Sequence, residues 1–195
     1  MQHLYAITNI SELQKLNPRD AEHVRVAGYR NPADGGGGEF YWDVNSKLDV
    51  DQGHVFQSTH EISGRWRRLP SANIDVRHFG ALPSSGDVSN QLQKALNACE
   101  SGGTIHIPAG HYTITRPLMV HQGTTVRGDG LLTEIHYSGP KGSSCWNAAQ
   151  RSPATSMSFY GLNTLVLNEH TSAFRLTGMS YSRFDLLFVH LRVPN

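Results

Sequence analysis

Short segments in which apolar and polar residues alternate run along most of the chain. Before residue 70, they cover residues 24–29, 40–44, 54–56 and 65–69. Alternation with a period of two is typical of strands that bury one face. We therefore predict a small antiparallel β meander in this region. A short helix precedes it, for which Ser11 and Gln14 have the spacing of a capping box.

Four consecutive glycines, Gly35 to Gly38, separate the first two of these strands and lead into the aromatic stretch Phe40, Tyr41 and Trp42. Glycine alone adopts positive φ without strain, so the run predicts a tight turn. A phosphate-binding loop is the other reading of a glycine run. It requires a Lys-Ser/Thr pair and a helix immediately afterwards, and the sequence has neither at this point.

An amphipathic helix is predicted between residues 88 and 99. Its apolar residues recur with helical spacing and share one face: Val88, Leu92, Ala95, Leu96 and Cys99. Asp87 precedes the helix as a candidate N-cap, and the glycine pair at 102–103 ends it. One face of this helix must therefore cover an apolar surface.

From residue 104 onward, short strands follow one another at similar intervals. The alternating apolar pairs are Ile105/Ile107, Tyr112/Ile114, Leu118/Val120, Thr124/Val126 and Ile135/Tyr137, and residues 163–167, 172–176 and 182–190 continue the pattern. No helices intervene, which excludes a Rossmann-type sheet, and the turns lack hairpin dipeptides, which argues against a simple meander. The pattern predicts a solenoid of parallel strands.

Composition narrows the class of protein. The chain has 195 residues, of which 38% are hydrophobic and 17% charged, and 17 Lys and Arg balance 16 Asp and Glu to a net charge of +1. This balance provides no electrostatic field for nucleic-acid binding. No window approaches the ~20 apolar residues of a membrane span, and the N-terminus does not resemble a signal peptide. We expect a soluble protein with no nucleic acid partner and no membrane insertion.

The cysteines and histidines indicate neither a disulfide framework nor a cofactor. Cys99 and Cys145 lie far apart in sequence and in different predicted elements, so we expect free thiols. The eleven histidines are scattered, and no pair has metal-motif spacing with a third ligand behind it. We predict no metal and no cofactor.

Two sets of motifs resemble one family. Residues 74–81 (IDVRHFGA), the amphipathic helix and residues 102–114 (GGTIHIPAGHYTI) resemble the opening of a right-handed β-helix of the pectate-lyase superfamily. Residues 34–43 (DGGGGEFYWD) and 64–68 (GRWRR) extend this to a resemblance to the N-terminal region of a bacteriophage tailspike. The chain departs from the family pattern before the helix, where the usual acidic pair is reduced to Asp87 followed by Val88.

The resemblance implies a mainly β fold in two parts. Residues 1–70 would form a small N-terminal β module, proximal to the virion at the neck of the spike. Residues 71–195 would form a right-handed parallel β-helix, capped at its N-terminal end by the helix at 88–99. The chain stops soon after an apolar strand, with room for three or four rungs, so we expect a partial or truncated β-helix.

The resemblance also implies partners and location. Tailspikes are homotrimers that contact other phage tail or baseplate proteins and bind host capsule or lipopolysaccharide. The protein would therefore assemble in the host cytoplasm and reside in the virion tail. The apolar stretch Phe184, Leu186, Leu187, Phe188 and Val189 exceeds what one inward face accommodates, which favours an interface such as that of a trimer.

The implied function is that of a tailspike whose full-length form degrades host surface polysaccharide by hydrolysis or elimination, with this chain alone inactive. The alternatives are a purely structural tail adaptor and a glycan receptor-binding protein that does not cleave. Candidate site residues are Glu134, Glu169, His170, Arg175, Arg183 and Asp185, of which Glu169 or His170 could stack near Arg183 or Asp185. Outward polar residues also occur on any solvated β-helix face, so we name no catalytic residue. The glycan, the host and the choice between hydrolysis and elimination are not encoded in any recognisable motif.

Overall fold

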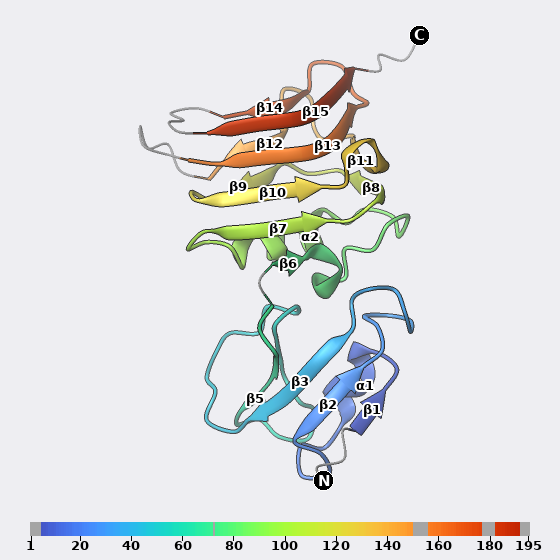
Figure 1. The fold of residues 1–195 in the computed structure, drawn as a ribbon, viewed down its shortest axis with the longest axis vertical. Helices are drawn as coiled ribbons and strands as arrows, with labels where there is room; N and C mark the ends of the chain where they lie inside the picture. The colour runs from blue at the N-terminus through green and yellow to red at the C-terminus, as the bar shows by residue number, and fades with distance from the viewer. Residues whose placement is uncertain (1–4, 72, 150–155, 177–181, 192–195) are drawn as a thin grey trace. The chain divides into compact units, whose positions relative to one another are not determined.

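The computed structural model describes residues 5–71, 73–149, 156–176 and 182–191 (Figure 1). Contacts divide the chain into two units, one made of Met1–Ala72 with Arg77–Gly80 and the other of Asn73–Val76 with Ala81–Asn195. The first is a small β module and the second a parallel β-solenoid of roughly three turns, so the predicted fold class is confirmed. No described helix is long and apolar enough to cross a membrane.

Five strands form the sheet of the first unit, in the order β1-β2-β3-β5-β4. Their bounds are Tyr5–Ile7 (β1), His23–Val26 (β2), Gly38–Asp43 (β3), Val55–Phe56 (β4) and Arg65–Arg68 (β5). β1 is parallel to β2, and the other pairs are antiparallel. The predicted meander is wrong in its connectivity, because β5 pairs with β3 as well as β4, and the parallel strand β1 was not expected.

Helix α1 (Ile10–Lys15) packs its buried residues Ile10 and Leu13 into the core of this unit. Its N-cap is Asn9, whose side chain accepts a hydrogen bond from the backbone N–H of Glu12 at 3.1 Å. The predicted capping box at Ser11 is therefore wrong: the helix begins before Ser11, and Asn9 satisfies one of its free N–H donors, that of Glu12.

A buried arginine holds the glycine turn of the first unit. Trp66 and Arg68 share the buried face of β5, whereas Arg65 and Arg67 lie on the other face, as the alternation predicts. The Arg68 guanidinium donates hydrogen bonds to the carbonyl oxygens of Gly36 and Gly53, each at 2.9 Å, and to that of Gly37. A buried cation is tolerated when its N–H donors are satisfied in this way.

The turn itself depends on Asp34 and on glycine conformations. Gly35 has φ +83°, and Gly38 has φ +156°, which confirms the prediction of positive φ within the run. The Asp34 carboxylate accepts four backbone N–H groups at 2.8–3.0 Å, from Tyr29, Arg30, Asn31 and Gly36. Burial on its own raises the pKa of Asp34, but these four donors outweigh it and hold the pKa below its ordinary value.

Among its described residues, the second unit contains ten strands. They are β6 (Ile74–Asp75), β7 (Gly103–Ile107), β8 (Gly110–Ile114), β9 (Leu118–Val120), β10 (Thr124–Gly128), β11 (Thr133–Tyr137), β12 (Ser144–Ala148), β13 (Ser158–Val166), β14 (Ser172–Arg175) and β15 (Arg183–Leu191). The 3-10 segment Gly130–Leu132 (η2) lies between β10 and β11, whereas the segment Val76–Phe79 (η1) follows β6 and belongs mostly to the first unit. All the strand pairs in this unit are parallel, and successive turns stack as β7-β8-β9, β10-β11-β12 and β13-β14.

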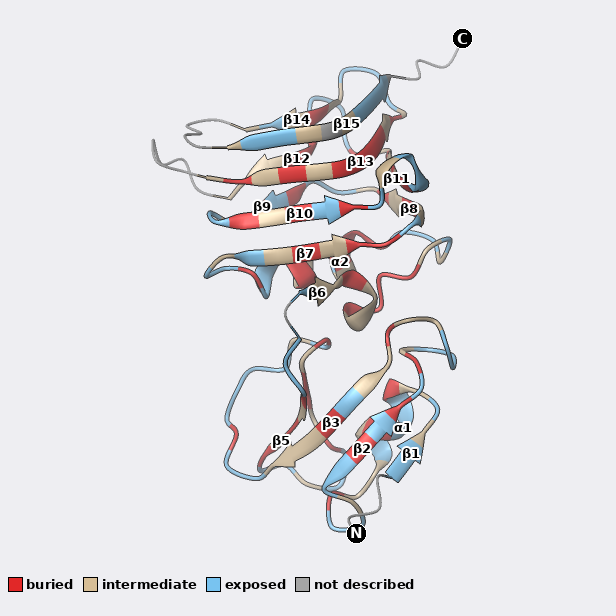
Figure 2. Ribbon diagram, viewed as in Figure 1, coloured by how far each residue is buried: buried red, intermediate tan, exposed pale blue. Residues whose placement is uncertain are grey.

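Parallel register arranges the interior in columns, as the buried stripes of Figure 2 show. On the first face, formed by β7, β10, the start of β13 and β15, Ile105 lies opposite Val126, Val126 opposite Phe159, and Phe159 opposite Phe184. On the third face, formed by β9, β12 and β14, a similar column contains Leu118, Trp146 and Phe174. The five predicted apolar pairs from Ile105 to Tyr137 are all fully buried on the inside, which confirms that alternation.

Helix α2 (Ser89–Asn97) covers the end of the stack next to β6 and β7 (Figure 1). Its predicted apolar face is buried, since Val88, Leu92 and Leu96 are each 1% exposed. The N-cap position is Val88, not Asp87. Asp87 instead accepts hydrogen bonds from the Ser89 N–H at 3.0 Å and the Thr115 hydroxyl at 2.7 Å, which ties the helix start to the turn after β8.

A bend at Gly161 lets β13 serve two faces of the solenoid. Its first residues pair with β10, and Asn163–Val166 pair with β11, so one strand replaces the two strands of earlier turns. Gly161 has φ +60°, and a Cβ there would lie 2.8 Å from the Gly128 oxygen and 2.9 Å from the Gly130 nitrogen. Both are backbone atoms, which cannot rotate away.

We predict that Gly161→Ala destabilises the solenoid by about 2 kcal/mol or more, because backbone strain adds to two close contacts. Gly142→Ala is the matched control: its φ is +78°, but nothing lies within 4 Å of the added Cβ, so only strain of about 1 kcal/mol remains. Urea unfolding followed by circular dichroism measures both. Equal losses in the two variants would contradict the proposed role of the bend.

We predict that Asp34→Asn destabilises the first unit by about 1–2 kcal/mol at pH 7, since the amide NH₂ replaces an oxygen that accepts two N–H groups. A carboxyl whose folded pKa is depressed stabilises the fold above its unfolded pKa of about 4 and loses this contribution as the pH falls. The difference between variant and parent should therefore shrink below pH ~4.

The control for this experiment is Asp49→Asn, the same chemical change at an exposed carboxylate. Urea unfolding of all three proteins at several pH values provides the comparison. A destabilisation by Asp34→Asn that stays constant down to the lowest pH, or an equal effect of Asp49→Asn, would contradict the role assigned to the carboxylate.

Candidate functional site

The outward side chains of the first face form a column across four strands. His106 on β7 lies opposite Arg127 on β10, Arg127 opposite Tyr160 on β13, and Tyr160 opposite Asp185 on β15. We call these four residues the first-face column. In-register pairing places such neighbours about 5 Å apart. Together they present one phenol ring, one imidazole and two charges of opposite sign.

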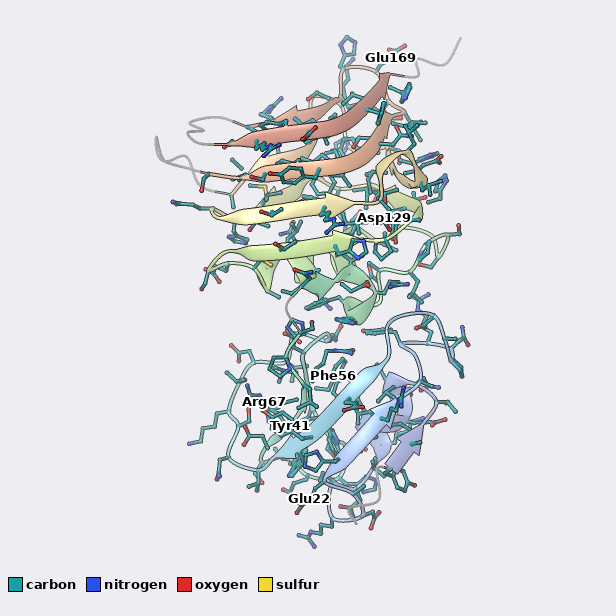
Figure 3. All side chains as sticks on the ribbon, viewed as in Figure 1. Glu22, Tyr41, Phe56, Arg67, Asp129 and Glu169 are labelled. Atoms are coloured by element: carbon teal, nitrogen blue, oxygen red, sulfur yellow. The ribbon has the colours of Figure 1, made fainter. Side chains whose placement is uncertain are left out.

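An ion pair with a cation–π contact holds one end of the first-face column, and a hydrogen bond holds the other. Arg183 donates to the Asp185 carboxylate at 3.2 Å and lies 5.7 Å above the centre of the Tyr160 ring. At the other end, His106 Nε2 lies 2.9 Å from Asp129 Oδ1. Figure 3 shows Asp129 at the turn that follows β10. These contacts limit the rotamers of side chains that are only partly buried.

Asp129 is held in its ionised form. Burial raises its pKa, but hydrogen bonds from His106 and from the Ala109 N–H at 2.9 Å outweigh this and lower the pKa below its ordinary value. A general acid for glycosidic cleavage needs the opposite, a raised pKa. Asp129 therefore suits a positioning or hydrogen-bonding role better than proton donation.

A second cluster lies on the outer side of the second face, which is formed by β8, β11 and the end of β13. Glu134 on β11 lies opposite His111 on β8, and His136 follows two residues later on the same strand. Glu134 Oε2 is 3.4 Å from His136 Nε2 and 3.8 Å from His111 Nδ1, and the two imidazole centres are 3.6 Å apart. Burial, and then the adjacent His111, lower the pKa of His136 against the opposing effect of Glu134.

The structure places the sequence candidates in separate regions. Glu134 belongs to the second-face cluster, and Arg183 with Asp185 belongs to the first face. Glu169 and His170 lie in the connection from β13 to β14, which Figure 3 shows at the β15 end of the unit. The carbonyl oxygen of His170 accepts the Gly142 N–H at 2.9 Å.

Arg175 also contacts this region, since its guanidinium donates to the Gly142 oxygen at 2.9 Å. Asp185 pairs with the part of β13 on the first face, whereas Glu169 follows the far end of β13 on the second face. The structure thus joins Arg183 to Asp185 but shows no contact of either with Glu169 or His170 among the described side chains. These four residues do not form one site within the chain.

The cysteines have no part in either cluster. Both are buried free thiols, as the sequence predicts. Burial raises the pKa of Cys99 to about 11 and raises that of Cys145 well above its ordinary value. Neither provides the thiolate that nucleophilic catalysis or metal binding requires.

Sequence spacing did not reveal the histidine cluster. His111 and His136 come from different turns, and no local motif connects them. The usable signal is the rung register: once Tyr112 and Ile135 are recognised as equivalent interior positions, His111 and Glu134 must be outward neighbours. Unequal turn lengths along the solenoid hide this equivalence from a search for a fixed period.

Comparisons with known proteins agree with the two-part architecture. Residues 6–71 match the family described as the phage tail protein small four-stranded beta-sheet domain. Residues 73–182 match the family described as rhamnogalacturonase A/epimerase, pectate lyase-like. The chain is 28% identical over 91 residues to the Mu-like prophage FluMu defective tail fiber protein of Haemophilus influenzae, covering 46% of this chain and 15% of that protein.

Tailspikes share its fold. The tailspike protein gp49 of Acinetobacter baumannii bacteriophage Fri1, a capsular polysaccharide depolymerase, has a TM-score of 0.71 at 17% identity, over 94% of this chain and 42% of that one. Full-length tailspike protein 2 from Escherichia coli O157:H7 bacteriophage CAB120 has a TM-score of 0.70 at 14% identity, over 89% and 23%. The chain thus spans less than half of the length of each of these relatives.

The predicted resemblance is confirmed by three features together: the phage tail domain, the stacked parallel turns and the tailspike neighbours. Because the second family match covers more than half of the chain, the protein belongs to the rhamnogalacturonase A/epimerase, pectate lyase-like family, and it carries a phage tail β-sheet domain ahead of that family's solenoid.

Proposed function

We propose that this chain is the N-terminal part of a phage tailspike. Residues 1–70 attach the spike to the virion tail, and residues 71–195 begin a β-helix that binds host surface polysaccharide, such as capsule or lipopolysaccharide. The observation that carries the proposal is the direct succession, in one chain, of a phage tail β-sheet domain and a β-solenoid. Assembly of the spike takes place in the host cytoplasm.

The first unit supports attachment through its rigidity. The Arg68 hydrogen bonds, the Asp34 turn and the aromatic core around Phe40 and Trp66 fix its sheet. A partly exposed ion pair also lies on the sheet surface: Arg67 donates to Asp43 at 3.0 Å and lies 5.6 Å above the Tyr41 ring (Figure 3). Such ordered side chains suit contact with another tail or baseplate protein.

The first-face column is the surface that we assign to polysaccharide. Tyr160 offers an aromatic ring, His106 offers polar ring atoms, and Arg127 and Asp185 offer hydrogen-bonding charges across successive turns. A sugar chain lying along the stack would meet one such group at each turn. Aromatic rings with a few fixed polar groups are the usual lining of ligand sites.

Degradation belongs to the longer spike in this proposal, and the chain alone is inactive. The Fri1 relative is a capsular polysaccharide depolymerase, and the present chain spans 42% of its length. Within the described residues, Asp129 contacts His106 and Asp185 contacts Arg183, and the pKa of Asp129 is lowered, whereas a general acid needs a raised pKa. A purely structural adaptor and a receptor that does not cleave remain the alternatives.

Homotrimer formation is part of the proposal, supported by the tailspike resemblance. The exposed apolar side chains on β15 support a trimer less than the sequence implied. Phe184 and Val189, 46% and 47% exposed, lie opposite the interior residues Phe159 and Thr164, so they belong to the core columns at the last described strand. Phe188, 37% exposed, is the outward one, and the Leu186 side chain lies outside the described residues.

We predict that Tyr160→Ala weakens the affinity of the spike for host polysaccharide by about fivefold or more, since it removes a ring contact worth about 1 kcal/mol. Tyr41→Ala is the matched control, because Tyr41 also lies under an arginine, at a nearly equal distance, but in the unit assigned to attachment. Binding to purified capsule or lipopolysaccharide is measured by biolayer interferometry.

Equal losses of affinity in the two variants would contradict the assignment of the first face, and no loss in either would contradict glycan binding there.

Reducing-end release and the absorbance of unsaturated uronate, measured on the same samples, separate the three function classes. The 195-residue chain is proposed to be inactive. This would be contradicted if the chain cleaved the polysaccharide and if Glu169→Ala or Asp185→Ala abolished that cleavage. Cleavage by the longer spike alone would exclude the adaptor and the receptor that does not cleave.

We predict that the spike sediments as a trimer at micromolar concentration. Replacing Phe188 with Ser should shift it toward the monomer, because an outward apolar side chain suits an interface between subunits. Lys141→Ser, at an exposed polar position, should leave the distribution unchanged. Sedimentation velocity measures both variants, and a spike that is monomeric throughout would count against the trimer.

A further inference from the structure

The second-face cluster brings three metal-binding side chains together from two turns of the solenoid. His111 lies on β8, and Glu134 and His136 lie on β11, which pairs with β8 in parallel register. All three are partly exposed on the outer side of their strands, and one donor atom from each lies within 4.8 Å of the other two. Neighbouring strands hold this arrangement, so it does not depend on a mobile loop.

The donor distances fit a single cation. Two ligands of a tetrahedral zinc ion, each about 2.0–2.2 Å from the metal, lie about 3.3–3.5 Å apart. Glu134 Oε2 is 3.4 Å from His136 Nε2 and 3.8 Å from His111 Nδ1. Small side-chain rotations would therefore place all three atoms around one ion without moving the backbone.

The two imidazoles lie side by side in the cluster. Their ring centres are 3.6 Å apart at an angle of 46°. A shared tetrahedral ion would hold the two ring centres about 5 Å apart, so metal binding requires the rings to turn away from each other about their side-chain bonds.

A buried acceptor beside the cluster is an independent indication. Asn163 on β13 lies opposite Glu134 on the outer side, yet it is only 8% exposed. Its Oδ1 atom is buried and accepts no hydrogen bond from any described residue. A water molecule in the fourth position of a three-ligand metal site is a donor that would satisfy such an atom.

We propose that His111, Glu134 and His136 bind one divalent transition-metal cation of the zinc class on the second face of the solenoid. Two imidazoles and one carboxylate form a donor set that suits Zn²⁺ better than Ca²⁺ or Mg²⁺, which prefer oxygen ligands alone. The ion links the first turn to the second, and a water molecule fills its fourth position beside Asn163. It lies on a different face from the first-face column, so it does not depend on the proposed glycan contact.

The test is a titration of the untagged 195-residue chain, stripped with a chelator, with ZnCl₂ in a calorimeter. We expect one zinc per chain, and we expect His111→Gln, Glu134→Gln and His136→Gln each to weaken the affinity at least about tenfold, since even second-shell changes cost this much. His106→Gln is the matched control, because it removes a partly exposed histidine that also contacts a carboxylate, but on the first face. It should change the affinity less than about twofold.

Nuclear magnetic resonance of the parent chain provides a readout that does not depend on how the variants fold. Stoichiometric zinc should shift the imidazole nitrogen signals of two histidines, with His111 bound through Nδ1 and His136 through Nε2. The proposal is overturned if no saturable site appears, if His106→Gln weakens binding as much as the cluster variants, or if zinc shifts other histidine signals in preference to these two.

Discussion

Parallel hydrogen bonding between successive turns is the interaction on which the second unit depends. It places each residue directly beside its counterpart one turn away. Residues at equivalent positions of successive turns therefore form columns along the stack. An inward column is buried from end to end and therefore favours apolar residues, such as Ile105, Val126 and Phe159. An outward column gathers polar groups from positions that lie far apart in the sequence.

The same pairing explains why the corners of the solenoid differ while the faces do not. Segments between strands can vary in length because they leave the register of the faces unchanged. Where a corner is tight, as at Gly161, the backbone of the previous turn lies so close that only glycine fits. Both outward clusters lie on the faces and near these corners, so their geometry follows from strand register and not from loop conformation.

The first unit uses a different constraint, a buried cation. The Arg68 guanidinium is removed from water, and the cost of its burial is offset by hydrogen bonds to the carbonyl oxygens of Gly36 and Gly37 in the glycine turn and of Gly53 outside it. A Cβ on Gly38 would lie 2.2 Å from Arg68 Nη1, so the turn supplies space as well as positive φ. The glycine run and the arginine motif, separate in the sequence, are thus two halves of one contact.

The sequence by itself determined the fold class, the positions of the interior columns and the covered face of the helix at Ser89–Asn97, because period and local propensity are encoded residue by residue. It did not determine the start of either helix, since a cap depends on which side chain reaches the free N–H groups, as Asn9 does in place of Ser11. It also missed the order of β3, β5 and β4, which depends on pairing between distant segments.

Only the tertiary structure decided which polar residues meet. It joined His111 to Glu134 and His136, and Arg183 to Asp185, while it left Glu169 and His170 in a separate connection. The physical reason is register: a shift of one residue between turns would send each of these side chains to the other face, and no local pattern fixes which residues lie opposite one another.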